Sequence, residues 1–364
     1  MTSPIESRVQ RYVGQLGDVG KISRLDGGIS SENYKVRLVN TKETVKQDMV
    51  VTLYKNPEEW WKLDKEYYLR DLVGNDPDLV LPAIIDSGDD NLEDGKPIRF
   101  LVREFAQGQD LDQCISDHDQ PYGDIDWVTL NSELGATFGA LHKHEVPFNG
   151  LIRSAEVGHL ISSSWSGYIT HQLESEIDMI QSLQDNHTIG IISTNQVQAS
   201  TYALSKRLGT ITDSNSDHIP LVHGDARMGN VIGTRREDKI NINTLVDFEW
   251  ALGGDPDIDL AFLENWLYFT NYKEEFFAHS DAFVKGYSDK RKISNDYSEK
   301  RTTYHALRSM NFLRIMFRDF EAKSINASPV LVNYVLRHFQ IIAGLSMGQS
   351  LADIGIPDLT RKNS

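Results

Sequence analysis

The chain has 364 residues, 40% of them hydrophobic and 25% charged, which is long enough to bury a sizeable core and to form two lobes or domains. Its formal net charge of −16 disfavours binding to nucleic acid or to an anionic membrane and modestly favours a cationic small molecule. A single cysteine, Cys114, excludes an internal disulfide, and no apolar stretch is long enough for a signal peptide or a membrane span. We therefore expect a cytoplasmic protein.

The first part of the chain shows the two periodicities that predict strands and helices, with apolar residues recurring every second or every third to fourth position. We expect a helix over 4–17, a hairpin over 22–38, a third strand over 48–55, a helix over 58–72, and strands over 79–85 and 98–105 joined by a polar loop. A polar break then follows at 106–111. We place a lobe boundary there, with an N-terminal lobe of residues 1–106 and a C-terminal lobe of residues 107–364.

The first hairpin turns at Gly27 and Gly28, followed by Ser30 and Ser31. Glycines let backbone N–H groups approach a phosphate, and either serine could donate a further hydrogen bond. Taken alone, the pattern favours an ordinary hairpin turn. The choice between a phosphate-binding hairpin and an ordinary hairpin turn therefore depends on residues later in the chain.

The remainder of the chain is mainly helical in pattern. Helices are expected over 126–145, 165–183, 195–208, 260–272, 280–287, 296–320 and 328–352, with a strand over 219–222.

The most informative segment lies between residues 221 and 261, where acidic clusters follow apolar runs that end in turns. Phosphoryl transfer from a nucleotide needs one carboxylate to accept a hydroxyl proton, and an Asn and an Asp to hold magnesium. Asp225, Asn230 five positions later, and Asp247 supply this set. Mg²⁺ takes only one or two carboxylates, so an amide oxygen can complete its protein ligands.

The ordered set, which begins at His223-Gly224-Asp225 and ends at Asp259, resembles the aminoglycoside phosphotransferase family, whose members share the fold of eukaryotic protein kinases. Protein kinases carry His-Arg-Asp and Asp-Phe-Gly here. This chain has Gly224 in place of the Arg and Glu249 in place of the last Gly, which favours the small-molecule branch. The resemblance implies an α+β, two-lobe fold with an antiparallel-sheet N-terminal lobe and a mainly helical C-terminal lobe.

The same resemblance implies the roles of the central residues. Asp225 would be the catalytic base, Asn230 and Asp247 would be the metal ligands, and ATP or GTP with Mg²⁺ would be the cofactors. In this context the glycine-rich first hairpin is expected to cover the phosphates.

The N-terminal lobe would bind the nucleotide. The backbone C=O of Glu104 and N–H of Ala106 would contact adenine, and Glu66 would pair with a phosphate-binding cation from the third strand. Aligned by its apolar residues, this strand has Thr52 at the position of the cation, whereas Lys55 faces the opposite side unless a bulge intervenes. Two alternatives remain open: Lys55 pairs with Glu66, or Thr52 faces the nucleotide, which the apolar register favours.

Several residues near the catalytic set are candidates for the acceptor site. Arg227 could face phosphate or substrate, or lie on the loop surface. Glu249, Asp257 and Glu264 could line an acidic pocket for an acceptor that carries an amine, or be ordinary solvated carboxylates.

Other residues are expected to support the site. His223, kept neutral, would hold the catalytic loop through its ring nitrogens, and His142 would buttress that loop. Asp255 would cap the helix that begins near Pro256, because Asp followed by Pro is a helix start signal. Asp259 would hydrogen-bond the catalytic loop, as its counterparts in the family do.

The expected function is transfer of the γ-phosphoryl group of ATP or GTP to a hydroxyl of a small molecule, such as an aminoglycoside or another amine- or sugar-type acceptor. A protein kinase is disfavoured because Asp-Phe-Gly and Ala-Pro-Glu segments are missing. A catalytically impaired nucleotide-binding protein remains an alternative, although Asp225, Asn230 and Asp247 are all intact. A carboxylate-based metal hydrolase would need clustered histidines, and only His223 is near.

Overall fold

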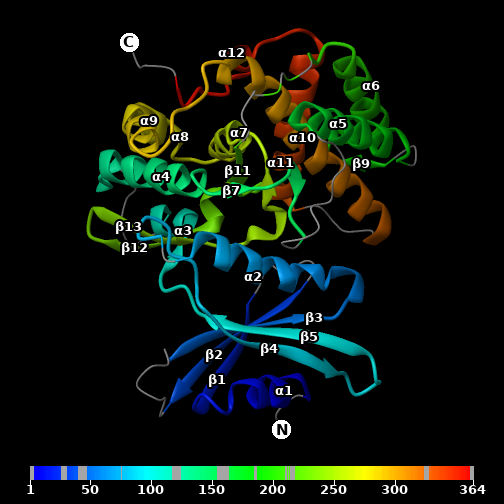
Figure 1. Ribbon diagram of the computed structural model, residues 1–364. Helices are drawn as coiled ribbons and strands as arrows, with labels where there is room; N and C mark the ends of the chain where they lie inside the picture. The colour runs from blue at the N-terminus through cyan, green and yellow to red at the C-terminus, as the bar shows by residue number, and fades with distance from the viewer. Residues whose placement is uncertain are drawn as a thin grey trace.

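A computed structural model of the protein describes residues 4–25, 31–39, 47–74, 76–116, 124–153, 164–183, 187–209, 211, 213, 218–323 and 328–360. The chain forms two lobes, a smaller one built on a sheet and a larger one built mainly of helices (Figure 1). This α+β, two-lobe arrangement confirms the fold expected from the sequence. In the described parts of the chain, no helix combines the length and the apolar character needed to cross a membrane.

The N-terminal lobe contains a five-stranded sheet in the order β1-β2-β3-β5-β4, with every neighbouring pair antiparallel. Its elements are α1 (Pro4–Val13), β1 (Asp18–Leu25), β2 (Glu32–Val39), β3 (Asp48–Tyr54), a short 3-10 helix (Pro57–Glu59), α2 (Trp61–Val73), β4 (Ile84–Asn91) and β5 (Pro97–Glu104). All seven residues of the central strand β3 are buried, because helices cover both faces of the sheet.

Alternation along β3 divides its side chains between these two helices. Val51 packs in the apolar cluster that contains Val9 and Tyr12 of α1. Tyr54 packs with Leu63 of α2 on the opposite face. Because strand side chains alternate with a period of two, Thr52 lies on the same face as Tyr54, towards α2.

The bounds predicted for the fourth strand are wrong. The strand was expected over 79–85, but β4 runs over 84–91 and includes the polar stretch that we expected to form a loop. Three aspartates stabilise this exposed edge through specific partners. Asp86 accepts a hydrogen bond from Gln15 Nε2 at 3.0 Å, Asp89 accepts one from Arg99 Nε at 2.9 Å, and Asp90 accepts one from Tyr12 Oη at 2.6 Å. Charged side chains on an edge strand also discourage pairing with another chain.

The C-terminal lobe contains short strands and a set of packed helices. Its strands are β6 (Gln109–Asp110), β7 (Glu145–Val146), β8 (Gly150–Leu151), β9 (Thr188–Ile189), β10 (Ile192–Ser193), β11 (Ile219–Val222), β12 (Val231–Arg236), β13 (Lys239–Leu245) and β14 (Leu252–Gly253). Its helices are α3 (Leu111–Ile115), α4 (Trp127–Leu141), α5 (Trp165–Gln181), α6 (Thr194–Ser205), α7 (Asp257–Leu267), α8 (Lys273–Ala278), α9 (Ser280–Ser288), α10 (Tyr297–Lys323), α11 (Pro329–Ser346) and α12 (Leu351–Ile354), with 3-10 turns at Met228–Asn230 and Phe248–Trp250.

Two helix predictions need correction. The helix expected over 328–352 is divided into α11 and α12, because Gly348 adopts a φ of +86° that ends the first helix, and Ser350 caps the second. The helix expected over 260–272 begins earlier, at Asp257, and ends at Leu267.

The segment between the lobes leads directly into the C-terminal lobe. β5 ends at Glu104, and β6, only five residues later, pairs with β12. The boundary that we placed after residue 106 stays a prediction. In Figure 1, α2 lies on the side of the sheet that faces the C-terminal lobe. Lys62 of this helix forms an ion pair with Glu249 at 3.3 Å, so the two lobes are in direct contact beside the acidic segment.

Candidate active site

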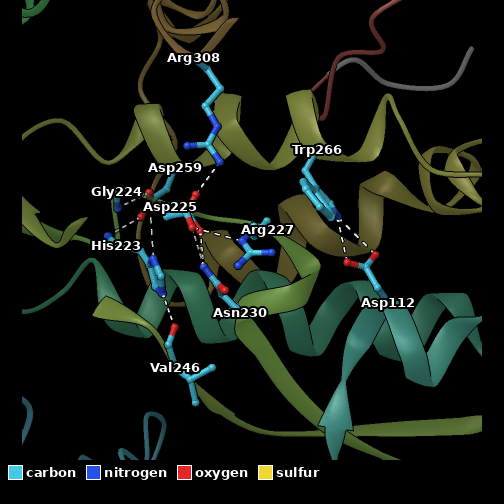
Figure 2. A network of polar contacts seen from close by, with 10 residues as sticks. All are labelled: Asp112, His223, Gly224, Asp225, Arg227, Asn230, Val246, Asp259, Trp266 and Arg308. Carbon is cyan, nitrogen blue, oxygen red and sulfur yellow. Dashed lines mark hydrogen bonds and ion pairs between the residues drawn. The ribbon is translucent and has the colours of Figure 1, made fainter. Parts of the chain in front are cut away.

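The predicted catalytic loop follows β11 and is fixed by α7. Asp259 Oδ2 accepts a hydrogen bond from the backbone N–H of His223 at 2.7 Å, and its Oδ1 accepts one from that of Gly224 at 2.9 Å (Figure 2). Gly224 adopts a φ of +76°, and a Cβ there would lie 2.1 Å from the carbonyl oxygen of Trp250. Only glycine fits this turn without strain. The geometry explains why Gly224 occupies the position at which protein kinases carry an arginine.

His223 joins the catalytic loop to the strand that precedes Asp247. Its Nε2 lies 2.9 Å from the carbonyl oxygen of Val246, and its Nδ1 accepts a hydrogen bond from the backbone N–H of Asp225 at 3.3 Å. Since a carbonyl can only accept, the proton must reside on Nε2, and the ring is the neutral Nε2–H tautomer. The ring is in contact with that of Phe248, with centroids 4.6 Å apart.

His142, at the end of α4, supports the same loop through Asp259. Its Nε2 lies 3.0 Å from Asp259 Oδ2, and its Nδ1 lies 2.8 Å from the hydroxyl of Tyr287 on α9. The two helices approach closely because glycines line their contact; a Cβ on Gly135 would lie 2.1 Å from the carbonyl oxygen of Phe283. Complete burial lowers the pKa of His142, which favours the neutral ring.

The carboxylate of Asp225 lies among three donors (Figure 2). Asn230 Nδ2 donates at 2.9 Å, Arg227 Nε at 3.2 Å, and Arg308 Nη2 of α10 at 2.5 Å. Burial alone would raise the pKa of Asp225, but the charges of Arg308 and Arg227 outweigh it and hold the pKa below its usual value. Asp225 is therefore ionised at neutral pH, the form in which it can accept a proton.

The two predicted metal ligands both interact with this carboxylate, Asn230 through a hydrogen bond and Asp247 through its charge. The amide nitrogen of Asn230 donates to both the backbone oxygen and Oδ2 of Asp225, each at 2.9 Å, so the amide oxygen is the atom left to ligate a cation. Asp247 has left-handed backbone angles, φ 64° and ψ 57°, which are rare for a residue other than glycine and often mark functional sites.

The charge around Asp247 fits a divalent cation. Burial raises the pKa of Asp247, and the nearby carboxylates of Glu249 and Asp225 raise it further. This excess of negative charge would be neutralised by a bound cation. Among the described residues no group of three or more His, Cys, Asp or Glu side chains could hold a metal ion. One carboxylate and one amide oxygen instead match Mg²⁺ bound together with nucleotide phosphates, for which few protein ligands suffice.

The structure excludes one of the two arrangements proposed for β3. Lys55 Nζ lies 2.7 Å from Glu32 Oε1, so the alternative in which Lys55 pairs with Glu66 is wrong. Thr52 is 3% exposed, and its hydroxyl donates to Asn33 Oδ1, its register partner on β2, at 2.7 Å. The side chain at the expected cation position is thus neutral and already bonded within the sheet.

The other predicted nucleotide-binding residues occupy several places. Gly27, Gly28 and Ser30 lie outside the described residues, and Ser31 lies just before β2. Glu104 is the last residue of β5, and Ala106 lies two residues later, between the lobes.

Two of the carboxylates proposed for an acceptor pocket lie in the protein interior instead. Glu264 is fully buried, and its carboxylate contacts Arg301 at 2.7 Å, His305 at 3.0 Å and the backbone N–H of Leu359 at 2.7 Å. Because every one of these partners is internal, the prediction that Glu264 lines an acceptor pocket is wrong.

Asp257 is likewise 1% exposed, and it contacts Ser294 and lies 3.6 Å from Lys300. It therefore does not line such a pocket either. Asp255 accepts from the backbone N–H of Asp257 at 3.0 Å, which is a capping contact at the start of α7. Its other oxygen contacts Lys300 at 2.8 Å.

Arg308 is the site residue that the sequence did not indicate. It lies 83 positions after Asp225 and on a different element, α10. That helix is buried around most of its circumference in its first half, so no polar stripe sets Arg308 apart.

A sheet lobe joined to a helical lobe that carries an Asp–Asn–Asp set on its loops defines a kinase-like phosphotransferase. The model of the phosphotransferase enzyme family (APH) matches residues 21–292, well over half of the chain, and the protein belongs to this family. No curated protein sequence matches the chain.

Solved structures show the same fold. A thermostable mutant of aminoglycoside phosphotransferase APH(4)-Ia, in a ternary complex with AMP-PNP and hygromycin B, has a TM-score of 0.63 at 14% identity, over 95% of this chain and 98% of that one. Aminoglycoside 2'-phosphotransferase-IIIa in its GDP complex has a TM-score of 0.59 at 13% identity, covering 95% and 99%. An ethanolamine kinase from Plasmodium vivax has a TM-score of 0.55 at 15% identity, covering 92% and 86%. At these identities the likeness establishes a shared fold.

Proposed function

We propose that the protein transfers the γ-phosphoryl group of ATP or GTP to a hydroxyl of a small molecule. The observation that carries this proposal is the carboxylate of Asp225, which is ionised, bonded to Asn230, and close enough to Asp247 for their charges to interact. The nucleotides and the hygromycin B in the neighbouring structures support it by analogy of fold. The cytoplasmic location stays a prediction of the sequence.

In the proposed reaction the acceptor hydroxyl oxygen forms a bond to the γ-phosphorus while the bond to the leaving nucleoside diphosphate breaks. Asp225 accepts the hydroxyl proton, and its ionised state at neutral pH makes it able to do so. The amide oxygen of Asn230 and the carboxylate of Asp247 would hold Mg²⁺, which supplies charge neutralisation at the phosphates when bound. Asp259 and His223 hold the base in place through the loop backbone.

The proposal also extends to the chemical class of the acceptor. The protein's net charge of −16 favours an acceptor that carries an amine, as aminoglycosides and ethanolamine do. Glu264 and Asp257, which had suggested a local acidic pocket, are bonded in the interior. Arg227 and Arg308 beside the base favour a second class, in which a carboxylate or phosphate lies near the reacting hydroxyl.

A screen with both nucleotides tests the function. Purified protein with Mg²⁺ and ATP or GTP is incubated with aminoglycosides, ethanolamine, sugars and hydroxy acids, and phosphoryl transfer is followed by ³¹P NMR. Acceptor-dependent product that is lost in Asp225→Ala supports the proposal. Nucleotide binding without transfer to any class of acceptor would instead favour the catalytically impaired alternative. Preference for the amine or for the hydroxy-acid members decides the charge of the acceptor.

A further inference from the structure

The proposed function requires a cation for the nucleotide phosphates, and β3 does not supply it. In protein kinases a lysine on this strand binds the phosphates and pairs with a glutamate on the following helix. Here the corresponding position is Thr52, whose hydroxyl is bonded to Asn33. The next lysine along the chain, Lys55, is paired with Glu32.

The helix glutamate nevertheless has a cationic partner, which comes from a different strand. Glu66 Oε1 of α2 lies 3.3 Å from Arg103 Nη1 of β5. In the β3–β5 register Arg103 is opposite Val50, and Leu101 is opposite Thr52. Residues opposite each other in an antiparallel pair share a face, so Arg103 lies on the same α2-facing side as Thr52, two residues along the adjacent strand from the partner of Thr52.

Arg103 and Glu66 also share a cavity with the predicted metal ligand. The cavity lies between α2, β5 and the end of β13, and Asp247 and Phe248 form part of its wall. The further residues that line it are Leu69, Arg70, Leu81, Pro82, Ile84, Leu245 and Val246. A cation, its glutamate partner and the predicted metal ligand therefore line one cavity, which is the combination that phosphoryl transfer requires.

We propose that Arg103 is the phosphate-binding cation of this protein, supplied by β5 in place of the lysine missing from β3. This inference rests on the proposed function. Glu66 holds the guanidinium through one of its nitrogens, and the group has further N–H donors for phosphate oxygens. A guanidinium suits this task because it stays charged and its planar donors match phosphate geometry.

The other cations near this cavity are committed to the protein. Arg70, near the end of α2, donates to the carbonyl oxygen of Leu81 at 3.1 Å and so joins this helix to the segment that precedes β4. Lys65 of α2 donates to the carbonyl oxygen of Glu249 and lies 4.6 Å from the ring centre of Trp61. Burial lowers the pKa of Lys65 to about 7, so its charge is only partly present at neutral pH.

Nucleotide affinities of a matched pair of variants test the proposal. Arg99 is the control: it also lies on β5 and joins α2, through Asp64 at 3.5 Å, but it does not line the cavity. Calorimetry with Mg²⁺ and ATP, ADP or adenosine is performed on wild type, Arg103→Met and Arg99→Met. We expect Arg103→Met to bind ATP and ADP about 10- to 100-fold more weakly, as for loss of a charge-assisted hydrogen bond. Adenosine affinity should not change, and Arg99→Met should resemble wild type.

Two further variants separate phosphate binding from a structural effect. Arg103→Lys keeps the charge and is expected to retain part of the ATP affinity. Thr52→Lys, added to Arg103→Met, returns a cation to the α2-facing side of β3 and is expected to recover much of the loss.

Three results would overturn the proposal. The first is unchanged ATP affinity in Arg103→Met, and the second is an equal loss for adenosine. The third is a phosphate-specific loss in Lys65→Met that Arg103→Met does not show. If wild type binds no nucleotide, the proposed function itself fails and this inference fails with it.

Discussion

Replacement of Asp259 by Asn tests whether the buried carboxylate of α7 fixes the catalytic loop. This side chain is fully buried and accepts from three donors, the backbone N–H groups of His223 and Gly224 and Nε2 of His142, at 2.7, 2.9 and 3.0 Å. Asparagine has nearly the same shape but only one acceptor oxygen. Its NH₂ group would therefore face at least one of these donors, and that buried donor would be left without a hydrogen-bond acceptor.

The expected cost follows from these contacts. A buried donor left without an acceptor costs about 1–3 kcal/mol, and the bonds that survive lose the strengthening of an ionised acceptor. We expect Asp259→Asn to lower the free energy of unfolding by about 2–5 kcal/mol. Because Gly224 directly precedes Asp225, the base would also lose its position, and we expect kcat to fall at least about tenfold with little change in nucleotide affinity.

Urea unfolding and steady-state kinetics at pH 7 measure both effects. Asp257→Asn is the matched control, because Asp257 lies on the same helix and is equally buried. Burial and the neighbouring Asp255 raise the pKa of Asp257 to about 7, so asparagine resembles a form that is already populated there. The control should change the unfolding free energy by less than about 1 kcal/mol. Asp259→Asn within about 0.5 kcal/mol of wild type, with kcat reduced less than twofold, would refute the reasoning.

Three more predictions concern the base, the metal ligands and pH. Asp225→Ala should reduce turnover by several orders of magnitude while nucleotide still binds, and a loss of only about tenfold, ~1.4 kcal/mol in the barrier, would exclude it as the base. Asn230→Ala and Asp247→Ala should weaken nucleotide binding in Mg²⁺ but not in EDTA, by calorimetry; an equal loss in both conditions argues against metal ligation. The folded-state pKa of Asp257, about 7, exceeds the ordinary aspartate value of 3.8, so its contribution to stability is full below about pH 4 and is lost as the pH rises through 7. Urea unfolding at pH 5 and pH 8 should show this fall in the free energy of unfolding in wild type and a smaller fall in Asp257→Asn. An equal fall in the two proteins would contradict the assignment.

The parts of the site that the sequence indicated are those built from neighbours along the chain. Asp225 and Asn230 are five positions apart on one loop, and their side chains are in contact. The turn at Gly224 and the loop hydrogen bonds that Asp259 accepts also come from the single segment 221–261. Local sequence restricts such turns strongly, because few residues tolerate a positive φ. Most strands and helices were predictable for a related reason, since alternating and helical periodicities identify them directly, whereas the two-lobe arrangement was implied by the family resemblance.

The acidic residues after the catalytic loop could not be assigned in this way. Asp257 and Glu264 have the composition of an acidic pocket, but their partners come from distant segments. Glu264 meets Arg301 and His305 of α10 and the backbone of Leu359, 95 positions away. A carboxylate can be buried only with such partners, and whether they exist depends on tertiary packing. Arg308 could not be predicted from the sequence for the same reason, because its contact with Asp225 depends on tertiary packing.

The position on β3 where protein kinases carry the phosphate-binding lysine shows what alternation along a strand can predict and what it cannot. Alternation favoured Thr52 over Lys55 as the residue that faces the nucleotide, and Lys55 is indeed paired elsewhere, with Glu32. The only substitute the strand itself offered was Lys55, whereas the partner of Glu66 is Arg103, 51 residues later than Thr52 in number but adjacent in the sheet. Arg103 directly precedes Glu104, whose carbonyl is expected to contact adenine. With Arg103 as the phosphate-binding cation, one strand end would contact both parts of the nucleotide. A substitution that shifts β5 along its axis would then weaken binding of adenosine and of phosphate together, whereas Arg103→Met should affect phosphate alone.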